Sequence, residues 1–335
     1  MKKILYVISN SRIGGAETLL ARLVERLDRK KFEPHVIVTD AIGPFHDRYQ
    51  KAAVSYHYLA TVPNKRAAIA SYARGKGIDV IHVVNHIEMW SLAALSAIPV
   101  VASLYMDLAQ PGGFADHWLP KARAAMQSLA GFVTDHEANL DALPPGPHVS
   151  VIKGGVDVKQ FKPASKTRPK TVAWVGRLSE GKGADLLVPL ATAMPDHSFT
   201  AFVSEPGKFL GPDVAKHAPP NLRLVAGATD AELAAALRRH RTFLSTSRSE
   251  GSPVSVMEGM ASGCCPVARA VGGLPALMAG GVNGILYAED AGVEGIAEAI
   301  RLARPRIGAA AAKAARAFSL QSMAKQHEDL YSKLC

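Results

Sequence analysis

Short apolar runs alternate with amphipathic stretches along almost the whole chain. The first run, KILYVIS at 3–9, has the composition of a buried strand, and the apolar spacing at 17–27 is that of a helix. Strands that alternate with helices form mostly parallel sheets whose two faces are covered. The pattern therefore predicts an α/β fold. Further strand-like runs lie at 33–40, 78–84, 99–105, 131–135, 148–157, 171–176, 198–203, 221–227, 242–247 and 265–269.

The alternation is interrupted once, at DVKQFKPASKTRPK (157–170), which is rich in Lys and Pro and has no periodicity. A chain of 335 residues also exceeds the size at which one core stops growing. We predict two doubly wound, Rossmann-like domains that face a central cleft, where ligands bind such folds. The predicted boundaries are 1–160 and 168–305, with C-terminal helices over 306–335 that pack back on the first domain.

Composition narrows the class of protein. Hydrophobic residues make up 48% and charged residues 20%, which is ordinary for a globular chain, and the net charge of +10 favours anionic partners. Three cysteines without metal-ligand spacing indicate a reducing compartment. Pro99 divides the long uncharged run at 89–106 into a helix-like and a strand-like half, so we do not expect a membrane span. We expect a cytoplasmic location.

The segment SRSEGSPVSVMEGMASG (247–263) follows a buried-strand pattern and enters a helix. Ser252 has the residue type of an N-cap, and Pro253 suits the first helical position. The helix is expected to extend to Ser262, with Gly263 as its C-terminal stop. Its amino end offers free N–H groups to an anion.

Two carboxylates flank this predicted anion site. Glu250 precedes the helix and Glu258 lies about one and a half turns inside it. Carboxylates beside a phosphate are useful when they accept hydrogen bonds from hydroxyl groups on either side of it. In WVGRLSEGKG (174–183), Arg177 and Lys182 surround a tight turn and can both point at a diphosphate. A sugar nucleotide matches this combination, although capping and solvated charges explain each pair separately.

The first strand-to-helix turn, ISNSRIGGAET (8–18), contains Gly14 and Gly15, which allow a ligand to approach the backbone. The turn has neither the G-x-G-x-x-G dinucleotide fingerprint nor the G-K-[ST] of a phosphate-binding Walker loop.

Taken together, these motifs resemble those of the retaining glycosyltransferases of family four, which have the GT-B fold. The order and spacing of the motifs carry the resemblance over nearly the whole chain. The matching segments are GGAE (14–17), VIKGGVDVKQFKP (151–163), GRLSEGKG (176–183), SEGSPVSVMEGMASGCCPV (249–267), VGGLP (271–275), NGIL (283–286) and FSLQSMAKQHEDLY (318–331).

The resemblance implies a role for each matched residue. Gly15 would offer its backbone N–H to the donor, Arg177 and Lys182 would hold the diphosphate, and Glu250 would contact the transferred sugar. Glu258 would bind the ribose. The catalytic residues are then Glu250, Arg177 and Lys182. The donor site would also include Gly14, Gly15, Val225, Gly227, Gly251, Ser252, Pro253, Val254 and Glu258, and Gly272 and Gly273 would border the sugar.

The chain departs from the family pattern at one position that matters. Many members place a His after the strand that matches PVVASLYMD, where this chain has Tyr105, Met106 and Asp107. Tyr105 and Asp107 are therefore the candidate substitutes on the acceptor side, and burial of Tyr105 in the sheet is the alternative.

The resemblance implies transfer with retention from a nucleotide-diphosphate sugar, with UDP favoured over GDP as the commoner donor type. No D-x-D pair occurs, so we expect no metal and no other cofactor. The acceptor is expected to be a glycan or lipid-linked, as in polysaccharide, lipopolysaccharide or glycolipid synthesis. No nucleic-acid partner is expected.

The segment 107–130 contains Phe114, Trp118 and Leu119 followed by Lys121 and Arg123, which would suit an anionic membrane surface; a helix packed on the first domain is the alternative. Three other functions remain open: a sugar-nucleotide epimerase, a non-catalytic nucleotide-binding protein of the same fold, and an NAD-dependent enzyme, which the absent fingerprint disfavours.

Overall fold

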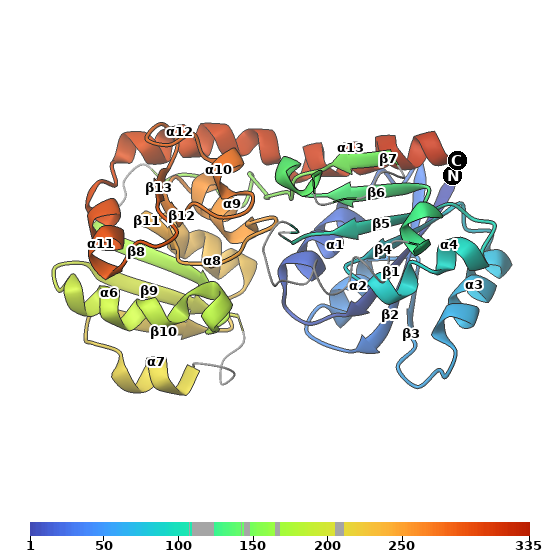
Figure 1. The fold of residues 1–335 in the computed structure, drawn as a ribbon, viewed down its shortest axis with the longest axis horizontal. Coiled ribbons are helices and arrows are strands. Elements are labelled where there is room, and N and C mark those ends of the chain that lie inside the picture. The colour runs from blue at the N-terminus through green and yellow to red at the C-terminus, as the bar shows by residue number, and fades with distance from the viewer. Residues whose placement is uncertain (107, 109–123, 142, 144–147, 165–167, 205–210) are drawn as a thin grey trace. The chain divides into compact units, whose positions relative to one another are not determined.

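A computed structural model describes residues 1–106, 108, 124–141, 143, 148–164, 168–204 and 211–335 of the chain (Figure 1). The chain divides into two compact units. The first consists of Met1–Gly155 together with Leu320–Cys335, and the second of Val156–Ser319. Each unit has a parallel sheet covered by helices, as the alternating pattern predicts.

The sheet of the first unit has seven parallel strands in the order β3-β2-β1-β4-β5-β6-β7. The central strands are buried on both faces, which explains their continuous apolar sequences. The strands are β1 (Lys2–Asn10), β2 (Phe32–Ala41), β3 (Ser55–Tyr58), β4 (Val80–Val84), β5 (Val100–Leu104), β6 (Gly131–Thr134) and β7 (His148–Val151).

Helices cover both faces of this sheet. Leu5 and Val7 of β1 pack with α3 and the α4 segment, whereas Tyr6 points to the opposite face and contacts α13. Helix α13 also packs on α1. The helices of the first unit are α1 (Gly15–Arg26), α2 (His46–Ala52), α3 (Lys65–Lys76), η1 (Ile87–Met89), α4 (Leu92–Leu95), η2 (Glu137–Asn139) and α13 (Leu320–Leu334).

The last helix, α13, is anchored to the first sheet by buried aromatic and imidazole rings. His82 of β4 and the hydroxyl of Tyr331 lie 2.7 Å apart, and the His82 ring stacks on His327 at 5.8 Å between centroids. The two ends of the chain lie side by side (Figure 1), where Lys2 donates to the carbonyl of Cys335 at 3.2 Å.

The sheet of the second unit has six parallel strands in the order β10-β9-β8-β11-β12-β13. Its strands are β8 (Arg168–Gly176), β9 (Ser198–Val203), β10 (Leu222–Ala226), β11 (His240–Ser245), β12 (Cys265–Arg269) and β13 (Ile285–Tyr287).

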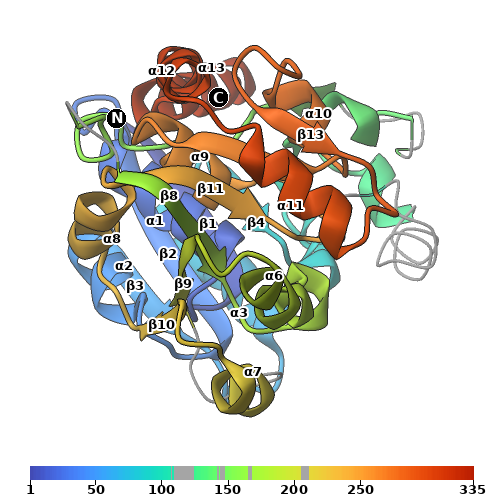
Figure 2. The same cartoon turned by 90° about the vertical axis from the view of Figure 1, so that its left-hand side faces the viewer.

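Two helical layers enclose this sheet. Helices α6 and α11 share one core with Trp174, and α8, α9 and α12 share the other with Phe243. Figure 2 shows α6 and α11 on one side of the sheet and α8 on the other. The helices are η3 (Glu180–Lys182), η4 (Ala184–Leu186), α6 (Leu187–Ala193), α7 (Gly211–His217), α8 (Asp230–Leu237), α9 (Val254–Ala261), α10 (Leu274–Leu277), α11 (Val293–Arg301), α12 (Pro305–Ala315) and η5 (Arg316–Phe318).

The division of the chain differs from the predicted boundaries in two places. The first crossing lies at 155/156, five residues before the predicted end of the first domain, because Val156 and Phe161 are buried in the core of the second unit. The C-terminal helices do not stay together: α12 packs on α9 and β12, and only α13, after the second crossing at 319/320, belongs to the first unit.

In both sheets the order in which strands are added reverses beside the first strand. The second and third strands lie on one side of it, and the later strands lie on the other side. The reversal lies between β1 and β4 in the first unit and between β8 and β11 in the second. Ligands of open parallel sheets bind beside the carboxyl ends of the strands at this point. In the second unit the segments that begin there are 177–183 and 246–253, which contain the predicted catalytic residues.

Candidate functional site

The loop after β8 is held on the end of β11 by a chain of hydrogen bonds. The indole N–H of Trp174 donates to the hydroxyl of Thr246 at 3.0 Å, and that hydroxyl donates to the carbonyl of Lys182 at 2.9 Å. Gly183 has a left-handed backbone with φ 63°, and an added Cβ would lie 2.2 Å from the carbonyl oxygen of Thr246. The glycine therefore permits the close approach that fixes the direction of Lys182.

This position of the loop brings two of the predicted catalytic residues into contact. The Lys182 ammonium lies 2.6 Å from a carboxylate oxygen of Glu250, although 68 residues separate them in the chain. The Glu250 side chain is 9% exposed and that of Lys182 is 29% exposed. A nearly buried carboxylate requires such a partner, because an isolated charge is costly to desolvate. The pair lies at the edge where parallel sheets bind ligands, and Lys182 remains accessible.

The turn at 271–275 joins the same cluster. The backbone N–H of Gly273 donates to the carbonyl of Glu250 at 3.1 Å, and Gly272 has φ 51°, a conformation that favours glycine. The structure thus brings the turn at Gly272 and Gly273 next to Glu250.

The helix after Glu250 begins one residue later than predicted. The predicted N-cap, Ser252, is not in the capping position: α9 begins at Val254, and Pro253 precedes it as N-cap with ψ 69°. The first backbone bond of the helix runs from the N–H of Met257 to the carbonyl of Pro253 at 3.0 Å. Because the proline side chain has no hydrogen-bonding atom, Pro253 contributes only its backbone carbonyl to the start of the helix. Gly263 ends the helix with φ 84°, as predicted.

The other residues predicted for the donor site are distributed along the same edge of the second sheet. Glu258 lies inside α9 and is 5% exposed, and Arg177 directly after β8 is exposed. Val225 lies near the end of β10, followed by Gly227 with φ 67°, whose N–H donates to Val203 at 3.2 Å.

The sequence did not indicate one ion pair that supports this edge. Arg248 forms a two-pronged pair with Asp185, both contacts at 2.8 Å, and its backbone N–H donates to Gly181 at 2.9 Å. Hydrogen bonding to Arg248 lowers the pKa of Asp185. The pair thus holds the segment before Glu250 against the loop that contains Lys182. Arg248 lies in the segment 247–263 but had no predicted role, Asp185 lies in none of the predicted motifs, and their proximity depends on the pairing of β8 with β11.

In the first unit, Gly14 and Gly15 lie where the chain passes from β1 into α1. Gly14 is the N-cap with extended φ −159°, and an added Cβ would approach the Glu17 carboxylate oxygen at 2.2 Å. At Gly15 an added Cβ would meet no atom within 4 Å. Packing within the described chain therefore does not require glycine at position 15, which leaves its backbone open to a ligand.

The region where the family His is missing has a different set of polar residues. The hydroxyl of Tyr105 lies 3.3 Å from Nε2 of His327 in α13, so its aromatic ring points toward the terminal helix, and Tyr105 is half-buried. Burial raises the pKa of the Tyr105 hydroxyl. The other candidate, Asp107, and the membrane-contact candidates Phe114, Trp118, Leu119, Lys121 and Arg123 lie outside the described residues.

Asn139 of η2 organises the chain on both sides of position 107, and the sequence analysis missed it. Its carboxamide oxygen accepts from the N–H of Leu108 at 2.8 Å, and its NH2 group donates to the carbonyl of Met106 at 2.9 Å and to the Thr134 hydroxyl at 2.6 Å. Asn139 is fully buried. It therefore fixes the segment after β5 to the end of β6.

A second polar cluster lies at the ends of β2 and β4. His86 Nε2 is 2.9 Å from the hydroxyl of Thr39, and Asp40 is 2.5 Å from the Lys65 ammonium. Burial lowers the pKa of His86, while the nearby Asp40 raises it. Asn85, just before His86, has a left-handed φ of 47° and accepts from the N–H of Tyr105 at 2.8 Å. A left-handed non-glycine residue beside a histidine, at the reversal point of the sheet, marks this edge as a candidate site of its own.

Two kinds of feature are absent from the described residues. No helix there is long and apolar enough to cross a bilayer. In the same part of the chain, no three His, Cys, Asp or Glu side chains are grouped so that they could hold a metal ion.

Models of known protein families match both units. Residues 13–160 match the family model described as Glycosyltransferase Family 4, and residues 169–303 match the model described as Glycosyl transferases group 1. A D-inositol 3-phosphate glycosyltransferase from Corynebacterium glutamicum is 28% identical over 214 residues, which are 55% of this chain and 51% of that protein. The match therefore spans about half the length of this relative. The protein of the same name from Corynebacterium efficiens is 24% identical over 320 residues, 79% of this chain and 74% of that protein.

Solved structures share the fold. Anabaena HepE in complex with UDP-glucose superposes with a TM-score of 0.83 at 18% identity, over 99% of this chain and 100% of that one. Sucrose-phosphate synthase from Thermosynechococcus elongatus superposes with a TM-score of 0.81 at 17% identity, over 100% and 99% of the two chains. Since the two family models cover most of both units and the two parallel sheets agree with these structures, the chain belongs to glycosyltransferase family 4 and has the GT-B fold.

Proposed function

We propose that the protein is a metal-independent, retaining glycosyltransferase that transfers a sugar from a UDP-sugar, or alternatively a GDP-sugar, to a glycan or lipid-linked acceptor. The observation that carries the proposal is the contact between Lys182 and Glu250 at the reversal point of the second sheet. It combines, on one edge, a cation for a diphosphate and a carboxylate for sugar hydroxyls.

Arg177 and Lys182 would bind the donor diphosphate. Arg177 is exposed and Lys182 is partly exposed, so a ligand can reach both. When the diphosphate binds, the Lys182 ammonium would divide its hydrogen bonds between a phosphate oxygen and Glu250. A carboxylate oxygen of Glu250 would then accept hydrogen bonds from hydroxyls of the transferred sugar, and such bonds are charge-assisted.

Glu258 and the turn at Gly272 and Gly273 complete the proposed donor site. Glu258, inside α9, would accept hydrogen bonds from the ribose hydroxyls, and the N–H groups at the start of α9 would face the phosphates. Gly15 of the first unit would add a backbone donor, since an added Cβ at this position would meet no atom within 4 Å.

In the reaction, the bond between the anomeric carbon and the diphosphate oxygen breaks, the acceptor hydroxyl oxygen bonds to that carbon, and the hydroxyl proton would pass to the leaving diphosphate. The transition state resembles an oxocarbenium ion, and negative charge develops on the leaving nucleoside diphosphate. Arg177 and Lys182 would stabilise that charge, which is the electrostatic work that a metal ion does in other sites. Retention at the anomeric carbon follows from the family assignment as part of the proposal.

The solved neighbours support the donor class. HepE was solved with UDP and with UDP-glucose. The Corynebacterium relatives are named D-inositol 3-phosphate glycosyltransferases, and because an inositol phosphate is neither a glycan nor lipid-linked, their name does not support the acceptor class. We therefore favour UDP as the nucleotide. Synthesis of a surface polysaccharide, lipopolysaccharide or glycolipid at the cytoplasmic side of a membrane remains part of the proposal.

The test begins with thermal stabilisation of the full chain by UDP-, GDP- and ADP-sugars, followed by Glu250→Ala and Lys182→Ala measured with the donor that binds. Both variants should lower kcat/KM by at least ~100-fold, because each removes a charged contact made in the transition state. Arg48→Ala is the matched control: Arg48 also pairs with a carboxylate, Glu25, and is about equally exposed, at 28%.

Loss of turnover in both site variants, with Arg48→Ala active, supports the assignment. Donor binding without transfer to any of a panel of glycan and lipid-linked acceptors would favour the non-catalytic reading. Stabilisation by NAD and by no nucleotide sugar would overturn the proposal.

A further inference from the structure

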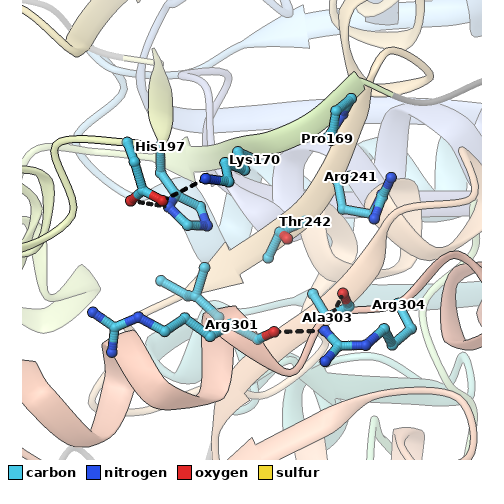
Figure 3. Close-up of a pocket in the computed structure, with 10 residues that line it drawn as sticks. Pro169, Lys170, His197, Arg241, Thr242, Arg301, Ala303 and Arg304 are labelled. Atoms are coloured by element: carbon cyan, nitrogen blue, oxygen red, sulfur yellow. Dashed lines mark hydrogen bonds and ion pairs between the residues drawn. The ribbon is translucent and has the colours of Figure 1, made fainter.

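The second unit has an open cavity at the amino ends of its strands, opposite to the edge that carries Lys182 and Glu250. The cavity has a volume of about 300 Å³, and it lies between the starts of β8 and β11 and the segment that connects α11 with α12 (Figure 3). Ligand pockets begin at about this size. Nothing in the proposed sugar transfer uses this edge of the sheet.

An irregularity in β8 shapes the wall of the cavity. His240 of β11 pairs with Arg168, and Thr242 pairs with Val172. A step of two residues in β11 therefore corresponds to a step of four residues in β8, so β8 bulges here. Within the bulge, Lys170 has a left-handed backbone with φ 55°. Bulges re-aim side chains and recur near functional sites, and a left-handed lysine is strained. The strand thus departs from regular geometry where it presents a lysine to the cavity.

The charge of the lining is mostly positive. Lys170, Arg241, Arg301 and Arg304 line the cavity, with Asp196 as the carboxylate among the described lining residues. Asp196 is already engaged: Lys170 lies 2.7 Å and His197 Nδ1 2.8 Å from its two oxygens. These hydrogen bonds hold the pKa of Asp196 well below its usual range, Lys170 contributing most.

Two arginines line the cavity close to the sheet. Arg241 is the second residue of β11, and Arg304 directly precedes α12. Arg304 is also the N-cap of α12, a helix of 11 residues, and its Nη1 donates to the carbonyl of Arg301 at 2.6 Å. The positive end of that helix adds to the field of the arginines.

We propose that this cavity, formed by the β8 bulge, Arg241 and Arg304, binds a small phosphorylated anion at a site separate from the sugar-nucleotide site. Lys170 and Arg241 line the cavity from two neighbouring strands and Arg304 lines it from the start of a helix, with Thr242 between them in the view (Figure 3). Several cationic donors around one hollow match the oxygens of a phosphoryl group, with which arginine makes paired bonds. The inference is independent of the proposed enzymatic function.

The experiment is isothermal titration of the full chain with inorganic pyrophosphate in the presence of saturating UDP, which occupies a nucleotide site. We expect one residual binding event. Arg241→Gln and Lys170→Gly should each weaken it roughly tenfold or more, because each removes a charge-assisted contact. Arg239→Gln is the matched control, since Arg239 is an exposed base two residues from Arg241 that does not line the cavity.

Lys170→Gly separates binding from folding. Glycine tolerates φ 55° without strain, and the Lys170–Asp196 pair is more than half exposed, so the melting temperature should equal or exceed that of the wild type while pyrophosphate binding falls. The proposal is overturned if UDP abolishes the pyrophosphate heat, or if Arg241→Gln and Lys170→Gly bind as the wild type does.

Flotation with phosphatidylglycerol vesicles distinguishes a lipid headgroup from a free phosphate. Vesicle binding that requires Arg241, together with pyrophosphate binding, would assign the phosphoryl group to a lipid as well as a soluble source. Vesicle binding without any pyrophosphate binding would contradict a site for a small anion.

Discussion

The packing of the described chain does not require a glycine at position 15, so substitution of Gly15 can test function without disturbing the fold. An added Cβ would meet no atom of the described chain, and the residue opens α1, where Ala is favoured over Gly by up to about 1 kcal/mol. We expect Gly15→Ala to keep or raise the melting temperature and to lower kcat/KM for the donor at least ~10-fold, because the methyl group intrudes where the donor approaches the backbone. Thermal unfolding and steady-state kinetics measure the two effects.

Gly75→Ala in α3 is the control for this substitution. Gly75 is also helical, and an added Cβ there meets nothing within 4 Å, but it lies away from the carboxyl edge of the sheet. It should be active. Equal activity of Gly15→Ala and Gly75→Ala would remove Gly15 from the donor site.

Single residues were predictable from the sequence where a motif fixes their place on a strand end. Lys182 and Glu250 follow β8 and β11, and since these strands are neighbours in the doubly wound order, their meeting follows from the topology. Asn139 was missed because its role depends on hydrogen bonds to a loop 31 to 33 residues away, which no local pattern records. Ser252 was assigned the cap by residue type, whereas the backbone places Pro253 there.

Among the elements, the loop from β8 into η3 depends most on one residue. Gly183 combines φ 63° with a potential contact of 2.2 Å to the backbone of Thr246. Gly183→Ala therefore requires either the loop or β11 to move, and we expect a loss of about 2–4 kcal/mol in unfolding free energy together with loss of activity, since Lys182 leaves Glu250. Urea titration and donor kinetics test this.

Gly181→Ala serves as the comparison in the same loop. An added Cβ at Gly181 has no atom within 4 Å, so this variant should be close to the wild type in stability. Similar stability of both alanine variants would mean that the loop does not depend on the close approach at Thr246.

Strands and helices were predicted better than their assignment to units. The run at 171–176 became part of β8, and the tail became α12 and α13, because apolar periodicity is a local property. The segment 157–170 was interpreted as a linker from its Lys and Pro content, yet Phe161 within it is buried in the second core. Composition therefore identified an irregular segment but not where the chain leaves one core for the other.

For the whole molecule, the terminal helix makes the first unit discontinuous in sequence. Residues Leu320, Met323, Leu330 and Tyr331 of α13 are buried, so the C-terminal helix completes the cover of one face of the first sheet. Burial of large apolar side chains contributes roughly 1.5–3 kcal/mol each, which together is comparable to the stability of a domain. We predicted that the helices over 306–335 pack back on the first domain, although no periodicity in the tail identified their partner, and the first unit includes only 320–335 of them.

The same helix makes the folding stability of the molecule depend on pH. Burial lowers the pKa of His327 to about 4 and that of His82 well below its ordinary value, so both imidazoles are neutral in the folded state and their rings stack. In the unfolded chain a histidine takes up a proton near pH 6.5. Between that pH and about 4 the unfolded state therefore binds more protons, and stability falls as the pH is lowered.

The loss expected from His327 is about 3 kcal/mol across this window, complete near pH 4 and absent above about pH 7. Urea titrations at pH 7.5, 6.0 and 5.0, followed by circular dichroism, measure it. His327→Leu should reduce the slope by the share of His327, because the leucine has no proton to gain on unfolding, while His82 keeps its own share. His217→Leu, which replaces an exposed histidine of the second unit, should keep the wild-type slope. If His327→Leu retains the full slope, the acid sensitivity does not arise where α13 closes the first unit.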